Sequence, residues 1–133
     1  MSGAGETFFT SIGCMDGRVQ DPIAEFGRRK FGVRYADTIT EAGLVGQLGK
    51  DNVDPALVEA IKKKLLISIE KHHSKGVIVH GHQDCAASNA VDDEKHKEDI
   101  LKTAEIIKSF VPQGTEVVPV FVVKELWKVV PLR

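Results

Sequence analysis

Residues 7–18 read TFFTSIGCMDGR, a stretch that joins an apolar segment to a cysteine, an aspartate and an arginine. Its first eight residues are mostly apolar and rich in β-formers, so we predict a strand over 7–14. Cys14 closes this strand, and Asp16 and Arg18 follow it directly. The function of these three side chains depends on which other residues they contact in the folded chain.

Strands and helices alternate after this stretch. The clearest helix begins with an aspartate and a proline, and its apolar residues recur at steps of four. Pro119 favours an edge position for the strand that contains it, and the tail 125–133 is expected to form a short strand or an interaction arm. The predicted elements are strands over 7–14, 31–40, 76–81 and 116–123, a short helix over 21–27 that Gly27 ends, a glycine-marked loop over 41–49, and helices over 54–76 and 93–114.

This alternation predicts an α/β fold, with a mainly parallel β-sheet flanked by helices in three layers. The chain has 133 residues, the length of one ordinary domain, and no linker or repeat divides it. We therefore expect a single domain over 1–133. A content of 42% hydrophobic and 28% charged residues is typical of a soluble globular protein.

The charge pattern and the cysteine count exclude several classes of protein. The net charge is −1 and basic residues are scattered, which argues against a nucleic-acid-binding surface. No apolar run approaches the roughly 20 residues that span a membrane. Two cysteines cannot build a disulfide framework, and no segment resembles a secretory signal. We predict a cytoplasmic, reducing setting, in which paired cysteines more often bind metal or react.

The second cysteine lies in GHQDCAA at 81–87, directly after a predicted strand. In a parallel sheet, functional side chains collect beyond the carboxyl ends of the strands. If the strands that precede Cys14 and His82 are neighbours, Cys14, His82 and Cys85 reach one crevice. One imidazole and two thiolates suit zinc and leave a fourth position open for water. The alternative is that both cysteines are small buried residues that only pack.

Asp16 and Arg18 are two positions apart and can pair beside this group. An adjacent arginine keeps a carboxylate ionised and fixes its orientation. Such a carboxylate can accept a hydrogen bond from a metal-bound water or occupy the open position itself. The alternative interpretation is an ion pair that only stabilises the turn.

CMDGR at 14–18 together with GHQDCAA at 81–87 resembles the signature pair of the β-class carbonic anhydrases, and the likeness extends over about 7–123. The resemblance implies that Cys14, His82 and Cys85 bind Zn²⁺ and that Asp16 and Arg18 form the catalytic dyad. It also implies a zinc lyase that hydrates carbon dioxide reversibly to bicarbonate and a proton. In that family the aspartate can leave the arginine and block the zinc.

The chain departs from the family pattern at Gly17, where serine is usual, at Ala86, where glycine is common, and at Glu41, where asparagine is usual. Other functions therefore stay open: hydrolysis of carbonyl sulfide or carbon disulfide on the same scaffold, or a non-catalytic zinc- or bicarbonate-binding protein. We expect a homodimer or a larger homo-oligomer, since active sites of this family commonly lie at a dimer interface.

Four further residues have side chains that could take part in chemistry, but structural roles are expected for them. His80 is expected to be a core or rim histidine rather than a proton shuttle. Asp84 is expected to cap the turn that follows it. His96 is predicted to be a solvated helix residue, and Trp127 an interface or core anchor.

Overall fold

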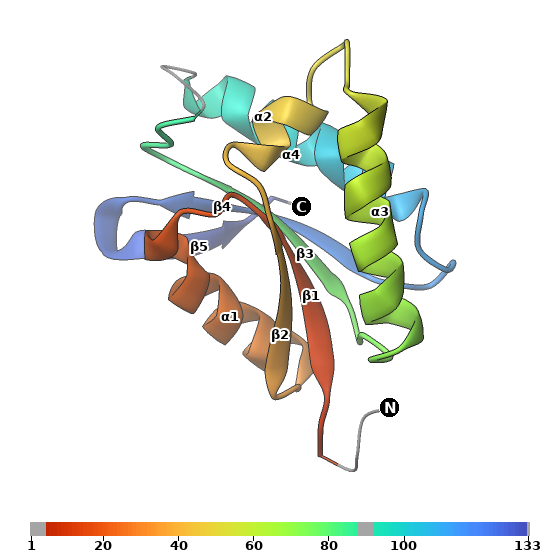
Figure 1. The fold of residues 1–133 in the computed structure, drawn as a ribbon. Helices are drawn as coiled ribbons and strands as arrows, with labels where there is room; N and C mark the ends of the chain where they lie inside the picture. The colour runs from red at the N-terminus through yellow and green to blue at the C-terminus, as the bar shows by residue number, and fades with distance from the viewer. Residues whose placement is uncertain (1–4, 88–91, 133) are drawn as a thin grey trace.

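The computed structural model describes residues 5–87 and 92–132. These residues form an α/β fold built on a five-stranded sheet with the order β2-β1-β3-β4-β5 (Figure 1). The first four strands of this order run parallel, and β5 is antiparallel to β4. This confirms the predicted fold class. The strands are β1 Phe8–Gly13, β2 Tyr35–Thr40, β3 Val77–His82, β4 Val117–Val123 and β5 Lys128–Pro131.

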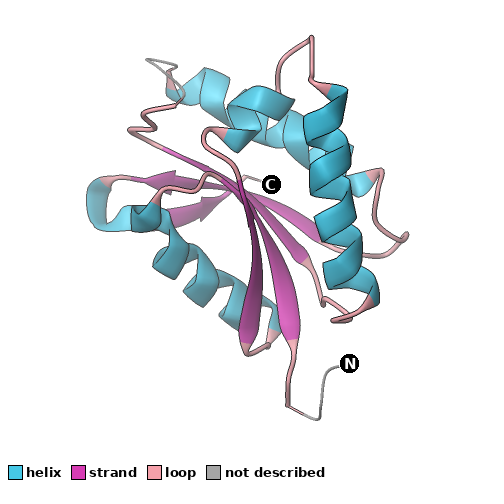
Figure 2. Cartoon of the chain, in the orientation of Figure 1, coloured by secondary structure: helices cyan, strands magenta, loops and turns pink. Residues whose placement is uncertain are grey.

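Helices cover both faces of the sheet and produce three layers (Figure 2). The helix α1, Gly17–Phe31, lies on one face, while α2 Leu44–Leu48, α3 Pro55–Glu70 and α4 Asp93–Lys108 lie on the other. Side chains alternate along β1: Phe9 joins the apolar cluster under α1, and Ile12 joins the cluster under the other three helices. The central strands β1 and β3 are therefore buried on both sides, whereas the edge strand β2 is mostly exposed or half-buried.

The helix α1 is longer than the predicted helix over 21–27, and Gly27 does not end it. Asp16 caps the helix by accepting a hydrogen bond from the backbone N–H of Arg18 at 2.9 Å. The helix ends at Gly32, which has a φ of 65° and donates its N–H to the carbonyl of Arg28. Gly27 instead lies inside the helix and is buried against the ring of Phe9. Its glycine character reflects this close packing and not a helix stop.

We expect Gly27→Ala to lower the free energy of unfolding by about 1–3 kcal/mol. A methyl group at this position would overlap the ring of Phe9, which is fully buried in the core. Urea unfolding followed by circular dichroism measures the change. Gly17→Ala in the same helix is the matched control, because nothing lies within 4 Å of its added Cβ. Equal stability of the two variants would contradict the packing argument.

The helices α3 and α4 end at Glu70 and Lys108, each six residues before its predicted end. The segment predicted as a loop over 41–49 contains the short helix α2, whose residues Leu44, Val45 and Leu48 are buried in the core. Asp54 caps α3 by accepting from the N–H of Ala56 at 2.9 Å, as its position before a proline suggests. No helix among the described residues is long and apolar enough to span a membrane.

The prediction that Pro119 marks an edge strand is wrong. The strand β4 lies between β3 and β5, and the tail forms β5, one of the two structures expected for it. Proline is tolerated because β5 pairs only with residues from Val120 onward, so Pro119 lies at the end of that pairing. Its carbonyl accepts a hydrogen bond from the N–H of Leu132 at 2.8 Å, and its missing N–H interrupts no central rung.

Candidate metal centre

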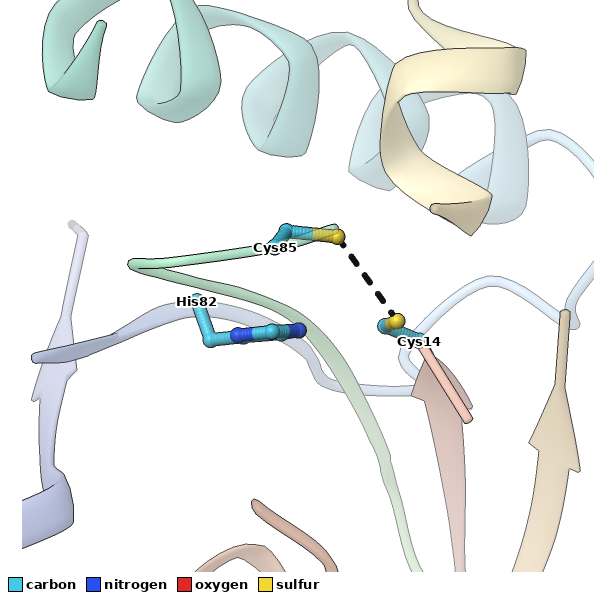
Figure 3. Close-up of side chains that lie close together, drawn as sticks. All are labelled: Cys14, His82 and Cys85. Carbon is cyan, nitrogen blue, oxygen red and sulfur yellow. Dashed lines mark hydrogen bonds between the residues drawn. The ribbon is translucent and has the colours of Figure 1, made fainter. Parts of the chain in front are cut away.

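Two neighbouring strands bring Cys14, His82 and Cys85 together. Cys14 directly follows β1, His82 is the last residue of β3, and Cys85 lies three residues further along. Because β1 and β3 are paired and parallel, their carboxyl ends meet at one edge of the sheet (Figure 3). One ligand atom from each side chain lies within 4.8 Å of the other two, so this group could hold a metal ion.

The ring of His82 is oriented as a metal ligand would be. The side chain is fully buried, and its Nδ1 donates to the backbone carbonyl of Gln83 at 2.7 Å. This hydrogen bond places the proton on Nδ1 and leaves a lone pair on Nε2. Nε2 is buried and has no hydrogen-bond partner among the described residues. A buried nitrogen of this kind is costly unless something binds it, and a metal ion would do so.

The two cysteines are free thiols with the spacing that a shared zinc ion requires. Their sulfur atoms lie 3.8 Å apart, so they are not joined by a disulfide. Two sulfurs bound to zinc at about 2.3 Å with tetrahedral angles would lie about 3.8 Å from each other. The donor set and its spacing therefore fit a tetrahedral zinc ion with three protein ligands.

The loop after β2 also reaches the site, where it makes a backbone contact that no sequence signal predicted. The backbone N–H of Gly43 donates to the sulfur of Cys14 at 3.4 Å and would stabilise a thiolate there. Gly43 has a φ of 62°, in the left-handed region that favours glycine, and an added Cβ would come within 3.0 Å of Ala87. Glu41, one of the departures from the family pattern, donates its backbone N–H to Gly13 at 3.2 Å.

Asp16 and Arg18 form the predicted pair beside this group. The guanidinium donates to the carboxylate of Asp16 through Nε, at 3.1 Å to Oδ1, and through Nη2, at 2.7 Å to Oδ2. Oδ2 of Asp16 lies 3.8 Å from Nε2 of His82, too far for a hydrogen bond but close enough to share a small site. In this arrangement the arginine, and not the candidate metal position, engages the carboxylate.

The contacts of Asp16 keep it ionised. The side-chain hydrogen bonds from Arg18 are the main reason why the pKa of this carboxyl falls to about 2, and the backbone N–H of Arg18 acts in the same direction. Partial burial opposes this shift and is outweighed. Asp16 is therefore a carboxylate at every pH at which the protein would work, able to accept hydrogen bonds and unable to donate them.

The structure corrects two of the roles assigned to nearby residues. His96 is not solvated: it is 5% exposed and packs edge-on against Phe121, because this face of α4 lies on β4. Asp84 makes its side-chain contacts with Arg18 at 3.1 Å and Lys124 at 3.0 Å, rather than with the turn that it was predicted to cap. Neither contact has a local sequence signal, because the partners are 66 and 40 residues away.

His80 is a core residue, as expected. Its ring is fully buried over Gly13, and Nε2 lies 3.1 Å from the hydroxyl of Ser11. Burial, reinforced by the neighbouring His82, lowers the pKa of His80, so the ring is neutral. A neutral, enclosed imidazole supports the end of β1 and is poorly suited to exchange protons with solvent.

Comparison with known families agrees with the observed fold. A family model described as "Putative carbonic anhydrase" matches residues 4–133, nearly the whole chain, and the protein belongs to this family. No curated protein matches the chain. This membership agrees with the resemblance carried by the motifs at 14–18 and 81–87.

Proposed function

We propose that this protein is a zinc-dependent lyase that hydrates carbon dioxide reversibly to bicarbonate and a proton. The observation that carries the proposal is the buried Nε2 of His82, which has no hydrogen-bond partner in the described part of the chain and faces two free thiols at zinc-like spacing. The family membership supports the same reaction. Cys14, His82 and Cys85 would hold the zinc ion, and Asp16 and Arg18 would act beside it.

Each side chain has a defined task in this reaction. Zinc, when bound, acts as a Lewis acid that lowers the pKa of a water molecule. Oδ2 of Asp16 would accept a hydrogen bond from the reacting water and so direct its lone pair towards carbon dioxide. Arg18 holds the Asp16 carboxylate in position and keeps it ionised. The Nδ1–H of His82, through its bond to Gln83, fixes the ring with Nε2 towards the zinc position.

Stopped-flow hydration of carbon dioxide by the zinc-loaded protein tests the proposal. We expect turnover that is lost on chelation and regained on adding zinc. Two thiolates carry more negative charge than three imidazoles and should acidify water less, so we expect a higher rate near pH 9 than near pH 7. A chelated sample at each pH is the control. Absence of turnover at both pH values, with zinc bound, would favour a non-catalytic binding protein or hydrolysis of carbonyl sulfide or carbon disulfide.

We also propose a homo-oligomer, at least a dimer, in a reducing cytoplasmic setting that keeps both thiols available. Large apolar side chains are exposed next to the candidate site: Met15, which precedes Asp16, is 61% exposed and Leu126 is 90% exposed. Burial of such side chains between subunits would be favourable. Light scattering at micromolar concentration should give at least twice the mass of one chain, and a monomer would contradict this part of the proposal.

A further inference from the structure

Arg18 makes contacts that the pair with Asp16 does not require. Asp16 occupies one edge of the guanidinium, through Nε and Nη2. On the opposite edge, Nη1 donates to Oδ2 of Asp84 at 3.1 Å and Nη2 donates to the backbone carbonyl of Asp84 at 3.1 Å. The two aspartates accept from different hydrogens of the Arg18 guanidinium. Both can therefore bind it at the same time, and they do not compete.

The flat face of the guanidinium is also covered. The Cζ atom of Arg18 lies 4.7 Å from the centre of the Trp127 ring, a cation–π distance. Trp127 belongs to the 3₁₀ turn Glu125–Trp127 that follows β4. Leu126 and Trp127 have φ values of 59° and 47°, a left-handed conformation that is unfavourable for bulky side chains. Such backbone persists only where surrounding contacts hold it.

Asp84 is itself held from the end of β4. Its Oδ2 accepts from Nζ of Lys124 at 3.0 Å, and the backbone N–H of Lys124 donates to the side chain of the preceding Gln83 at 2.7 Å. Asp84 has a φ of 57°, and both its carboxylate and its carbonyl contact Arg18. Arg18 is therefore connected to the loops that follow three different strands, β1, β3 and β4.

We propose that Asp84 and Trp127 are positioning residues that hold Arg18 from behind, so that Arg18 presents a fixed edge to Asp16. This inference deepens the proposed function and rests on it. The side chains of Arg18, Asp84 and Lys124 are 43%, 53% and 58% exposed, so their ion pairs contribute little to folding stability. Their effect is on geometry: a long side chain held at both edges and one face loses the freedom to swing away from the carboxylate that it orients.

Asp84→Asn is the variant that tests this role. Asparagine has the same shape and accepts the left-handed backbone, while the charge that holds Nη1 is lost. We expect kcat for carbon dioxide hydration to fall about 3- to 10-fold, with KM and zinc content unchanged, because the arginine is less well placed. Trp127→Leu, which removes the aromatic face from a different element, should change kcat in the same direction. Glu25→Gln is the matched control, since it removes an exposed carboxylate that pairs with Arg29 at 3.1 Å elsewhere on α1.

A second measurement does not depend on activity. The Nε–H of Arg18 gives its own signal in a nitrogen–proton correlation spectrum, and its exchange with water reports how firmly the side chain is held. We expect exchange to quicken about tenfold in Asp84→Asn and in Trp127→Leu and to stay unchanged in Glu25→Gln. An unchanged Arg18 signal in both variants would overturn the positioning role, whatever the activity. If the Arg18 signal responds as expected but the unaltered protein never hydrates carbon dioxide, the proposed function fails while the contacts of Arg18 stand.

Discussion

Replacing Cys85 by serine is expected to abolish zinc binding and to remove the stability that zinc confers. A serine hydroxyl is a poor ligand for zinc, and the remaining pair, Cys14 and His82, would leave two positions open. A metal ion that binds only the folded state stabilises it by about 4 kcal/mol when its free concentration is 1,000 times the dissociation constant. The variant should lose a stabilisation of this order when zinc is in excess.

Metal analysis and thermal unfolding of the unaltered protein and Cys85→Ser, each with zinc and with a chelator, measure these effects. We expect about one zinc per chain in the unaltered protein and less than a tenth of that in the variant. With the chelator, the melting temperatures of the two proteins should nearly coincide, because serine is close to cysteine in size. That condition separates loss of the ligand from loss of packing. Full zinc content in the variant would mean that the ion binds elsewhere.

Asp16→Asn should leave zinc bound and reduce kcat by about two orders of magnitude, within the range typical of a lost acid–base group. Asparagine caps helices as well as aspartate does, so α1 should keep its start at Gly17. The amide loses the negative charge that accepts a hydrogen bond from the reacting water and that pairs with Arg18. The variant thus separates the chemical role of the residue from its structural role.

Asp54→Asn is the matched control for this variant. Asp54 caps α3 in the same way, by accepting a backbone N–H two residues later at 2.9 Å, and it is not part of the candidate site. The two variants should differ in the stopped-flow rate and should agree in zinc content and melting temperature. Full activity of Asp16→Asn would show that the pair with Arg18 stabilises the turn and takes no part in the reaction, which is the alternative left open by the sequence.

Local sequence signals predicted most of the elements. The aspartate before Pro55 marks the start of α3 because capping depends on neighbouring residues alone. The prediction that Gly27 ends a helix is wrong for the opposite reason. Gly27 is a glycine because it packs closely against Phe9, which lies on another element. Likewise, Pro119 is tolerated inside β4 because the pairing between β4 and β5 involves only residues from Val120 onward. A residue whose role is set by a distant partner has no local pattern that could reveal it.

The candidate ligands could be named from the sequence because Cys14 ends one predicted strand, while His82 and Cys85 directly follow another. Gly43 could not be assigned in this way, since its contribution is a backbone N–H that any residue carries. The contacts of Arg18 with Asp84 and Trp127 were also missed. Charged and aromatic residues are frequent on protein surfaces, and only their positions in space distinguish these from the others.

Residue types and their positions relative to the predicted strands were enough to predict the alternation of strands and helices, the candidate ligands Cys14, His82 and Cys85, and the pairing of Asp16 with Arg18. Only the folded chain shows that β1 and β3 lie side by side, that Nε2 of His82 is buried without a hydrogen-bond partner among residues 5–87 and 92–132, and that loops after three strands contact Arg18. These features arise from contacts between segments far apart in the chain, whose energies depend on packing in three dimensions and leave no periodic trace in the sequence.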